Sequence, residues 1–253
     1  MQQALVVQRG GRIVHEAYED GFDAHKPHAL YSGTKSFWGI AALEARADGL
    51  FDLDERVKDG ITVRMLLNLT AGYGFGGLGS AVPTYERALE IEPKNPPGET
   101  FTYGGIPLQV FGWFFASRLA GKTPHEYLRE KVLVPAGVEI AAWRTLKDGT
   151  HPLPTGAQLR ARSWLAYGTY VLAHRERYGE AFTGSACNAR YGLGWWLSGP
   201  KLPGDLFYAS GAGGQGMYVI PSLDVVAVRF ADGGSSNHPA TVKKILTTLS
   251  SRA

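Results

Sequence analysis

The sequence predicts a mixed α/β protein of the α+β type, with one antiparallel sheet drawn from both chain ends, flanking helices and a helical insertion. Segments with strand-like patterning lie near both ends of the 253-residue chain, and helical periodicity dominates between them. No Pro/Ser/Gly stretch is long enough to act as a linker. Residues 1–253 are therefore expected to form a single domain, with the sheet part at about 1–60 and 185–253 and the helical part at about 61–184.

The first sixty residues predict a hairpin followed by a helix. Ala4–Val7 and Arg12–Tyr18 are rich in strand-forming residues, and a glycine-containing turn separates them. The pattern changes period after Ser32, where apolar residues recur on one helical face: Phe37, Ile40, Ala41 and Leu43. Gly49 is typical of the residue that follows a helix. Ser32 is thus expected at a helix N-terminus.

Three helix start signals follow in the middle of the chain. Thr62 is a typical N-cap for a helix over Val63–Leu69, and Pro107 fits the first turn of a helix that runs to about Leu119. Thr123 followed by a proline is typical of another start. Residues 158–177 are expected to continue helically after a polar stretch at about 147–156.

Strand patterns return in the last quarter of the chain. The expected strands are Tyr191–Leu197, Leu206–Ser210, Gly216–Ile220 and Val225–Phe230, and a last helix is expected over Ala240–Leu249. Trp195 and Trp196 are adjacent on one of these strands, so one of them should face away from the core and line a cleft.

Composition and charge exclude several classes of partner. With 44% hydrophobic residues, the chain can bury a large core. The net charge of +3 comes from scattered lysines and arginines rather than a basic run, so we expect no nucleic-acid partner. No window approaches 18 consecutive apolar residues, so no membrane span is expected.

Two features bear on the cellular compartment. The single cysteine, Cys187, permits no internal disulfide and is expected to be an idle thiol. Residues 1–10 lack the basic start, the long apolar segment and the cleavage site of a secretion signal. These features indicate a cytoplasmic protein, or a periplasmic one if a leader has already been removed. They leave the oligomeric state open.

The main candidate for chemistry is a Ser-x-x-Lys motif in residues 31–37 (YSGTKSF). A helical spacing of three places the Ser32 and Lys35 side chains on one face. A serine hydroxyl is a weak nucleophile until a base takes its proton, and a buried lysine can be that base. The Ser32 backbone N–H at the helix start would stabilise the resulting oxyanion. The structural alternative is a capping serine beside a solvated lysine.

Other motifs are weaker. A second Ser-x-x-Lys, Ser198-Gly199-Pro200-Lys201, contains a proline and lies in a loop, where no helix aligns its side chains. Residues 72–79 (GYGFGGLG) contain Gly-x-Gly-x-x-Gly but follow a helix, so we interpret them as a loop beside the site. The sequence contains no Gly-x-Ser-x-Gly elbow, His-Glu-x-x-His motif or Cys/His cluster, so we expect no α/β-hydrolase, no metal and no cofactor.

Further segments follow the Ser-x-x-Lys motif in a defined order: 53–57 (LDERV), 61–72 (ITVRMLLNLTAG), 97–105 (PGETFTYGG) and 208–221 (YASGAGGQGMYVIP). Together they resemble the superfamily of serine β-lactamases, penicillin-binding D-alanyl-D-alanine peptidases and esterases. The resemblance is greatest to its class C-like branch, which includes carboxylesterases and nylon-oligomer hydrolases. It covers most of the chain and implies a β-lactamase/transpeptidase-like fold.

The resemblance also implies roles for individual residues. Segment 97–105 is similar to the family's Tyr-x-Asn element, so Tyr103 takes the place of the catalytic tyrosine, which would relay the Ser32 proton to the leaving group. Gly105 stands where the family has an asparagine that holds the amide of a β-lactam. This departure argues against antibiotic hydrolysis.

Residues 208–221 correspond to the family's Lys-Thr-Gly strand, but the lysine and threonine are absent, since Tyr208, Ala209 and Ser210 align there. The resemblance makes Gly211 or Ala212 the second oxyanion-hole donor beside Ser32. It also makes a further set of residues candidates for substrate contact: Gly105, Tyr208, Ser210, Gly213 and Gln215. Without the strand lysine, the site has less to hold a substrate carboxylate.

These features predict a serine hydrolase that cleaves a small-molecule ester or amide through an acyl-enzyme, with Ser32, Lys35 and Tyr103 as catalytic residues. Two alternatives stay open. One is a residual β-lactamase or D-amino-acid peptidase. The other is a penicillin-binding-like scaffold that binds a ligand without catalysis.

Overall fold

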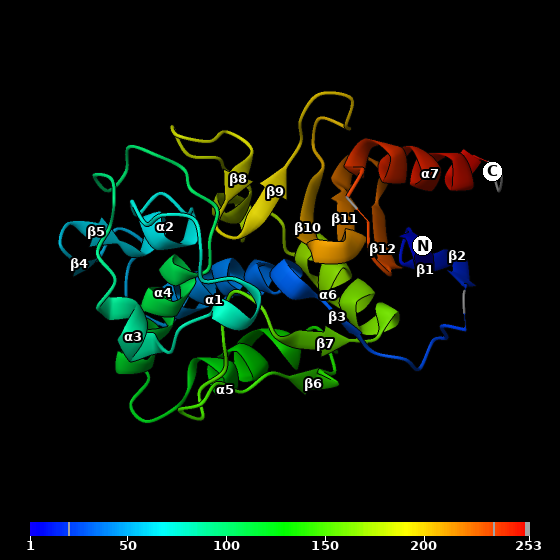
Figure 1. The fold of residues 1–253 in the computed structure, drawn as a ribbon. Coiled ribbons are helices and arrows are strands. Elements are labelled where there is room, and N and C mark those ends of the chain that lie inside the picture. The colour runs from blue at the N-terminus through cyan, green and yellow to red at the C-terminus, as the bar shows by residue number, and fades with distance from the viewer. Residues whose placement is uncertain (20, 235, 251–253) are drawn as a thin grey trace.

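A computed structural model describes residues 1–19, 21–234 and 236–250. Within these ranges the main feature is a seven-stranded antiparallel sheet with strand order β2-β1-β12-β11-β10-β9-β8. Its strands are β1 (Gln2–Arg9), β2 (Arg12–Tyr18), β8 (Tyr191–Gly192), β9 (Trp195–Leu197), β10 (Phe207–Gly211), β11 (Gln215–Ile220) and β12 (Val225–Ala231). Strand β1 pairs with β12, with Val6 opposite Val228. The prediction of one sheet assembled from both chain ends is therefore confirmed (Figure 1).

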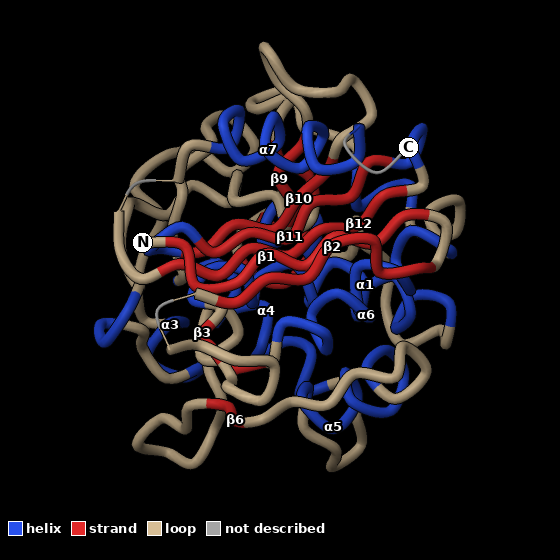
Figure 2. Tube along the Cα trace, turned by 90° about the vertical axis from the view of Figure 1, so that its right-hand side faces the viewer, coloured by secondary structure: helices blue, strands red, loops and turns tan. Residues whose placement is uncertain are grey.

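Helices cover both faces of this sheet (Figure 2). Helix α7 (His238–Ser250) packs on one face, where Val242 and Ile245 join a buried cluster with residues of β1, β10 and β11. Helix α6 (Ala161–Ala173) packs on the other face, against β12 and β11. Helix α1 (Ser36–Ala47) lies next to α6 and runs toward the helical part of the molecule (Figure 1).

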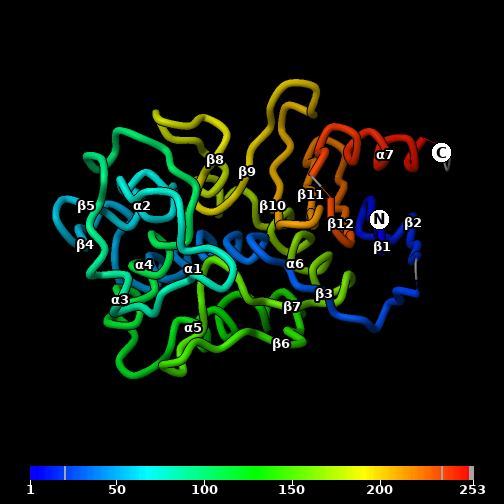
Figure 3. The backbone as a smooth tube through the Cα atoms, viewed as in Figure 1, coloured from blue at the N-terminus to red at the C-terminus, as the bar shows by residue number. Residues whose placement is uncertain are grey.

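The helical part lies at the far end of α1 from the chain termini (Figure 3). Its helices are α2 (Val63–Leu67), α3 (Tyr85–Leu89), α4 (Ile106–Ser117) and α5 (Pro124–Leu128), the last continued by a π-helical turn, Arg129–Leu133. Two small sheets accompany them, β3 (His28–Ala29) with β7 (Ala157–Leu159) and β6 (Ala142–Trp143), and β4 (Arg56–Lys58) with β5 (Ile61–Thr62). Short 3-10 segments cover Tyr31–Lys35, Gly79–Ala81, Gly179–Phe182, Ala212–Gly214 and Pro221–Leu223.

The helix boundaries follow local chemistry that the sequence shows. The Thr62 hydroxyl accepts the Met65 N–H at 3.3 Å and caps α2. At α5, Thr123 and Glu126 form a reciprocal capping box, in which Glu126 accepts the Thr123 N–H at 2.7 Å. Gly49 follows α1 with a φ of +74°, a conformation that glycine adopts at low cost. These three boundaries were predicted correctly.

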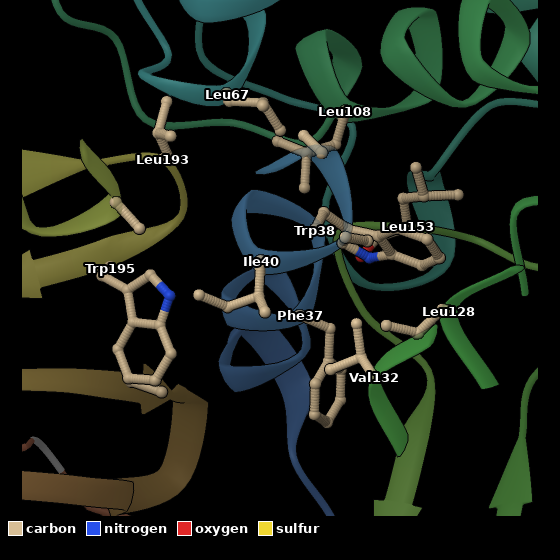
Figure 4. Packing of buried hydrophobic residues seen from close by; sticks show 14 of the residues in the cluster. Phe37, Trp38, Ile40, Leu67, Leu108, Leu128, Val132, Leu153, Leu193 and Trp195 are labelled. Atoms are coloured by element: carbon tan, nitrogen blue, oxygen red, sulfur yellow. The ribbon is translucent and has the colours of Figure 1, made fainter. Parts of the chain in front are cut away.

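Helix α1 passes through the core. Phe37, Trp38 and Ile40 are fully buried, and Figure 4 shows them between Trp195 on one side and Leu128 on the other. Complete burial of such a side chain contributes about 1.5–3 kcal/mol to stability. Since α1 is buried along most of its length, the segment that precedes it is held in a fixed position.

The structure corrects two expectations about the elements. Tyr191–Leu197 is not one strand: β8 and β9 form a hairpin, and Gly194 turns the chain with a φ of +91°. Residues 157–159 form strand β7, and the helix expected over 158–177 spans Ala161–Ala173. Hydrophobic periodicity did not reveal β7, because a three-residue segment is too short to distinguish a strand from a helix.

The expected division into two parts is also only approximate. The large sheet takes residues 2–18 from the expected N-terminal sheet part, whereas the rest of 1–60 includes α1. Conversely, α6 belongs to the expected helical part but packs on the large sheet.

Candidate active site

Ser32 lies in the 3-10 segment Tyr31–Lys35, which leads directly into α1. A 3-10 helix has three residues per turn, so side chains at positions i and i+3 are eclipsed. The Ser32 and Lys35 side chains therefore meet, with Lys35 Nζ 3.0 Å from Ser32 Oγ. The sequence predicted a helix start at Ser32, and the tighter 3-10 geometry brings the two side chains directly over one another.

The backbone is strained just before the serine. Tyr31 has a φ of +47°, in the left-handed region that non-glycine residues seldom adopt. Such strain persists only when the surrounding structure imposes it, and it is concentrated at functional sites. Gly33 packs tightly on the other side of Ser32, since a Cβ there would lie 2.9 Å from a ring carbon of Trp164. The serine is thus fixed from both sides.

Lys35 is 1% exposed, and its amine donates to the Pro154 carbonyl oxygen at 3.2 Å. Burial lowers the pKa of Lys35 to about 7, and within the described residues no charged side chain contributes to this shift. Near neutral pH a substantial fraction of the amine is therefore unprotonated. Only the neutral amine can accept a proton from Ser32.

Tyr103 completes a three-residue cluster. Its ring centroid lies 4.8 Å from Lys35 Nζ. Burial raises the pKa of Tyr103, and a hydrogen bond with Ser32 offsets part of this increase. The phenol thus keeps its proton at neutral pH and can act as a proton donor. The structure brings together all three side chains that the sequence analysis proposed as catalytic.

Aromatic neighbours hold the Tyr103 ring. Trp196 stacks on it with a centroid distance of 5.6 Å and an interplanar angle of 25°, and Tyr191 meets it edge-on at 6.2 Å. Trp195 is fully buried, whereas Trp196 is half-buried. The expected alternation of the two tryptophans is confirmed, and the outward one supports Tyr103.

Strand β10 lies against the 3-10 segment that carries Ser32. Strand β9 pairs with β10 only at Phe207 and Tyr208. The remaining residues of β10, 209–211, are therefore not paired with β9. A Cβ at Gly211 would lie 2.1 Å from the Leu30 carbonyl oxygen, so only glycine permits this close approach. Ser32 is in the first turn of its segment, where N–H groups lack intrahelical acceptors. The N–H groups of Ser32 and of Gly211 or Ala212 are thus candidates for an oxyanion hole.

The predicted substrate-contact residues lie in different places. Gly105 packs beneath the glycine-rich loop: its N–H donates to Gly76 O at 2.9 Å, and a Cβ would lie 1.9 Å from Gly77 O. This close packing explains why no asparagine occupies the position. The loop at 72–79 therefore lies beside the Tyr103 segment.

Gln215 is 1% exposed, and its side-chain amide is occupied by backbone groups. It donates to the Ala231 carbonyl oxygen at 2.7 Å and accepts the Ala231 N–H at 3.0 Å. Gln215 therefore holds the β10–β11 turn to β12, and a contact of this residue with substrate stays a prediction. Gly213 lies in this turn with a φ of +77°.

Tyr208 and Ser210 lie near His238, the first residue of α7. Ser210 Oγ is 3.3 Å from His238 Nε2, and the rings of Tyr208 and His238 are 4.6 Å apart. Burial and the nearby Arg229 charge lower the pKa of His238 to about 4, so the imidazole is neutral at pH 7. The structure places these two residues with a neutral histidine rather than with a cation.

Sequence reasoning missed the Pro154 carbonyl, which contacts Lys35. Residues 147–156 lacked a motif, and a main-chain acceptor has no sequence signal of its own. In the described parts of the chain, no three His, Cys, Asp or Glu side chains are grouped as a metal site requires. The described helices are also too short or too polar to cross a membrane.

Comparisons with known proteins found one matching family model and several structures with a similar fold. The model of the Beta-lactamase family matches residues 3–250. A β-lactamase from Mycobacterium bovis superposes with a TM-score of 0.75 at 21% identity, over 96% of this chain and 93% of that chain. A penicillin-binding protein from Bacillus halodurans superposes with a TM-score of 0.77 at 17% identity, over 97% and 96%. EstCE1, a hydrolase with promiscuous acyltransferase activity, gives 0.77 at 16% identity, over 98% and 93%. A search of curated protein sequences found no match.

Proposed function

This chain belongs to the β-lactamase family, and we propose that it is a serine hydrolase that cleaves a small ester or amide through an acyl-enzyme on Ser32. One observation carries the proposal. Lys35 Nζ lies 3.0 Å from Ser32 Oγ, in a buried position where the pKa of the lysine is lowered to about 7. If Ser32 were only a capping residue and Lys35 only a surface lysine, the amine would remain in water, because burying it costs free energy.

The first step is acylation. Neutral Lys35 accepts the Ser32 proton as Oγ attacks the substrate carbonyl carbon, and the carbonyl π electrons move to oxygen. The backbone N–H of Ser32 and that of Gly211 or Ala212 stabilise the oxyanion. One such donor is worth about 2.7–4 kcal/mol in comparable hydrolases.

Collapse of the tetrahedral intermediate needs a proton on the leaving oxygen or nitrogen. Tyr103 is suited to donate it, because burial keeps its pKa raised and its hydroxyl lies beside Ser32. The Lys35 ammonium then returns a proton to Tyr103. A water molecule next attacks the acyl-enzyme with Lys35 as base, and the ester bond to Ser32 breaks as Ser32 regains a proton.

Two positions support an ester or unactivated amide over a β-lactam. Tyr208, the first of the three residues that align with the family's Lys-Thr-Gly, has a neutral phenol in place of an ammonium group. Gly105 has no side chain and no room for one. These two positions therefore supply neither the cation nor the amide that would hold a β-lactam.

Labelling and substrate choice test the proposal and separate its alternatives. We expect a fluorophosphonate probe to label Ser32, and the label to be absent from Ser32→Ala. A p-nitrophenyl ester should be turned over faster than nitrocefin. Faster nitrocefin turnover would favour the β-lactamase alternative, and absence of both labelling and turnover would favour the non-catalytic scaffold.

A further inference from the structure

We propose that residues 151–154 form a positioning strap for Lys35, and that Trp38 and Gln109 are positioning residues that fix this strap and thereby aim the lysine amine at Ser32. The inference rests on the proposed function, because it assigns a role to groups around the proposed base. It explains a set of hydrogen bonds to the carbonyl groups of residues 151–154, which the arrangement of Ser32, Lys35 and Tyr103 alone does not explain.

Each carbonyl of the strap is taken by a side-chain donor. The four bonds are Tyr85 Oη to His151 O at 2.9 Å, Trp143 Nε1 to Pro152 O at 3.0 Å, Trp38 Nε1 to Leu153 O at 2.6 Å, and Lys35 Nζ to Pro154 O at 3.2 Å. The four donors come from three separate places in the sequence, because Lys35 and Trp38 are only three residues apart. An irregular segment held in this way cannot rotate one carbonyl without breaking a bond to another residue.

Leu153 is held at both of its polar backbone atoms. Its N–H donates to Gln109 Oε1 at 2.9 Å, and its carbonyl accepts from Trp38. Gln109 is fully buried, and its Nε2 donates to Pro83 O at 2.6 Å, which fixes the orientation of the amide. These bonds fix the orientation of the peptide group between Leu153 and Pro154. The next carbonyl along the chain, that of Pro154, is the one that Lys35 contacts.

Lys35 ends the 3-10 segment and Trp38 lies three residues later in the first turn of α1, so the two side chains lie on one face. They donate to two successive carbonyls, those of Pro154 and Leu153. The 3-10 segment and the first turn of α1, which are continuous, therefore carry the proposed base and the residue that holds the strap beside it. This spacing makes the direction of the amine depend on the indole N–H of Trp38.

The contact has a chemical consequence for Lys35. A neutral amine has two N–H bonds and one lone pair, so a hydrogen bond to Pro154 O helps direct the lone pair toward Ser32. The carbonyl also stabilises the ammonium form and so opposes the effect of burial on the pKa. Loss of this acceptor should lower the pKa of Lys35 further and leave the amine free to rotate.

The Pro154 carbonyl oxygen and the Ser32 hydroxyl are the two hydrogen-bond partners of the Lys35 amine among the described residues. Tyr103, from the segment before α4, is the titratable side chain that faces the amine. Strand β10, which packs against the 3-10 segment, carries no charged residue between Phe207 and Gly211. Burial is the cause of the lowered Lys35 pKa, and no charged side chain among the described residues contributes to it.

The test compares Trp38→Phe and Gln109→Met with Trp195→Phe. Trp195 is a matched control, because it is also fully buried but its indole N–H has no hydrogen-bond partner among the described residues. NMR of protein with ¹³C-labelled lysine, assigned with Lys35→Ala, would follow the Lys35 titration without requiring turnover. The pH profile of kcat/KM on a p-nitrophenyl ester gives a second readout.

We expect Trp38→Phe and Gln109→Met to lower the Lys35 midpoint by about 0.5 pH units or more. We also expect kcat to fall about tenfold while KM changes less, because orientation matters most in the transition state. Trp195→Phe should leave the midpoint in place. Two strap variants that fold but keep the wild-type midpoint would overturn the proposal. A lowered midpoint in a protein that turns over no ester or amide would instead support the strap and reject the proposed function.

Discussion

Lys35 Nζ lies 3.0 Å from Ser32 Oγ, and both side chains belong to one turn of 3-10 helix. The turn itself accounts for their proximity, because residues three apart are eclipsed in this helix. The tertiary structure adds burial, which lowers the pKa of Lys35 to about 7. The 3-10 geometry thus brings the Lys35 amine to the Ser32 hydroxyl, and burial in the fold lowers the pKa of the amine so that it can act as a base.

The pH dependence of hydrolysis should report this reactivity. Because only neutral Lys35 can accept the Ser32 proton, we expect kcat/KM to rise with pH with a midpoint near 7. At high pH activity should fall as Tyr103 loses its proton, with a midpoint above 10, since the pKa of this phenol is raised. Steady-state rates on a p-nitrophenyl ester, corrected for spontaneous hydrolysis, would show both limbs. A rising limb near the ordinary lysine pKa would contradict the assignment of Lys35 as base.

The buried amine should also cost stability. The folded-state pKa of Lys35 lies below its unfolded value of 10.5, so the penalty for burying the cation is complete below about pH 7. It is relieved as pH rises from 7 to 10.5. We expect Lys35→Met to increase the free energy of unfolding by about 2–3 kcal/mol at pH 6, and by less at pH 10.

Urea denaturation of Lys35→Met at both pH values measures this difference. Lys147→Met, at an exposed lysine, is the control and should change stability by no more than about 0.5 kcal/mol. A Lys35→Met protein that is less stable than the wild type at pH 6 would argue against a buried ammonium.

Gly105→Asn restores the family's asparagine but should not restore its chemistry. A Cβ at this position would lie 1.9 Å from the Gly77 carbonyl oxygen, so the glycine-rich loop would have to move. We expect a loss of about 2–4 kcal/mol in unfolding free energy and no gain in nitrocefin hydrolysis. Gly204→Ala, where no atom lies within 4 Å of the added Cβ, is the control for stability. A stable Gly105→Asn protein that hydrolyses nitrocefin would refute this account of the position.

Gly211→Ala tests the approach of β10 to the serine segment. The added Cβ would lie 2.1 Å from the Leu30 carbonyl oxygen and would force β10 away from Ser32. If an N–H of this turn helps bind the oxyanion, kcat/KM should fall about 100-fold. At Gly199 the nearest atom to an added Cβ is 3.4 Å away, so Gly199→Ala should keep nearly full activity. Full activity in Gly211→Ala would exclude this part of β10 from the oxyanion hole.

The parts of the fold predicted correctly are those with strong local signals. The capping threonines of α2 and α5, Gly49 after α1 and the alternation at Trp195 and Trp196 each depend on neighbours in sequence. Strand β7 was missed because it has three residues and pairs with two distant strands. Its pairing is decided by tertiary contacts that periodicity does not record.

The site shows the same division. The Ser-x-x-Lys spacing and the tyrosine segment identified the three side chains that the structure brings together. Pro154 could not be predicted, because it acts through its carbonyl, and the position of that carbonyl depends on Trp38 and Gln109. The backbone partner of the Gln215 amide could not be predicted either, because Ala231 lies sixteen residues away.

The most direct test of the central claim is steady-state hydrolysis of a p-nitrophenyl ester series by the wild type, Ser32→Ala, Lys35→Ala and Tyr103→Phe. We predict turnover by the wild type, a loss of kcat of about 10³-fold or more in the Ser32 and Lys35 variants, and about 10²-fold in Tyr103→Phe. Full activity in Ser32→Ala, or no turnover of any ester or amide by the folded wild type, would contradict it.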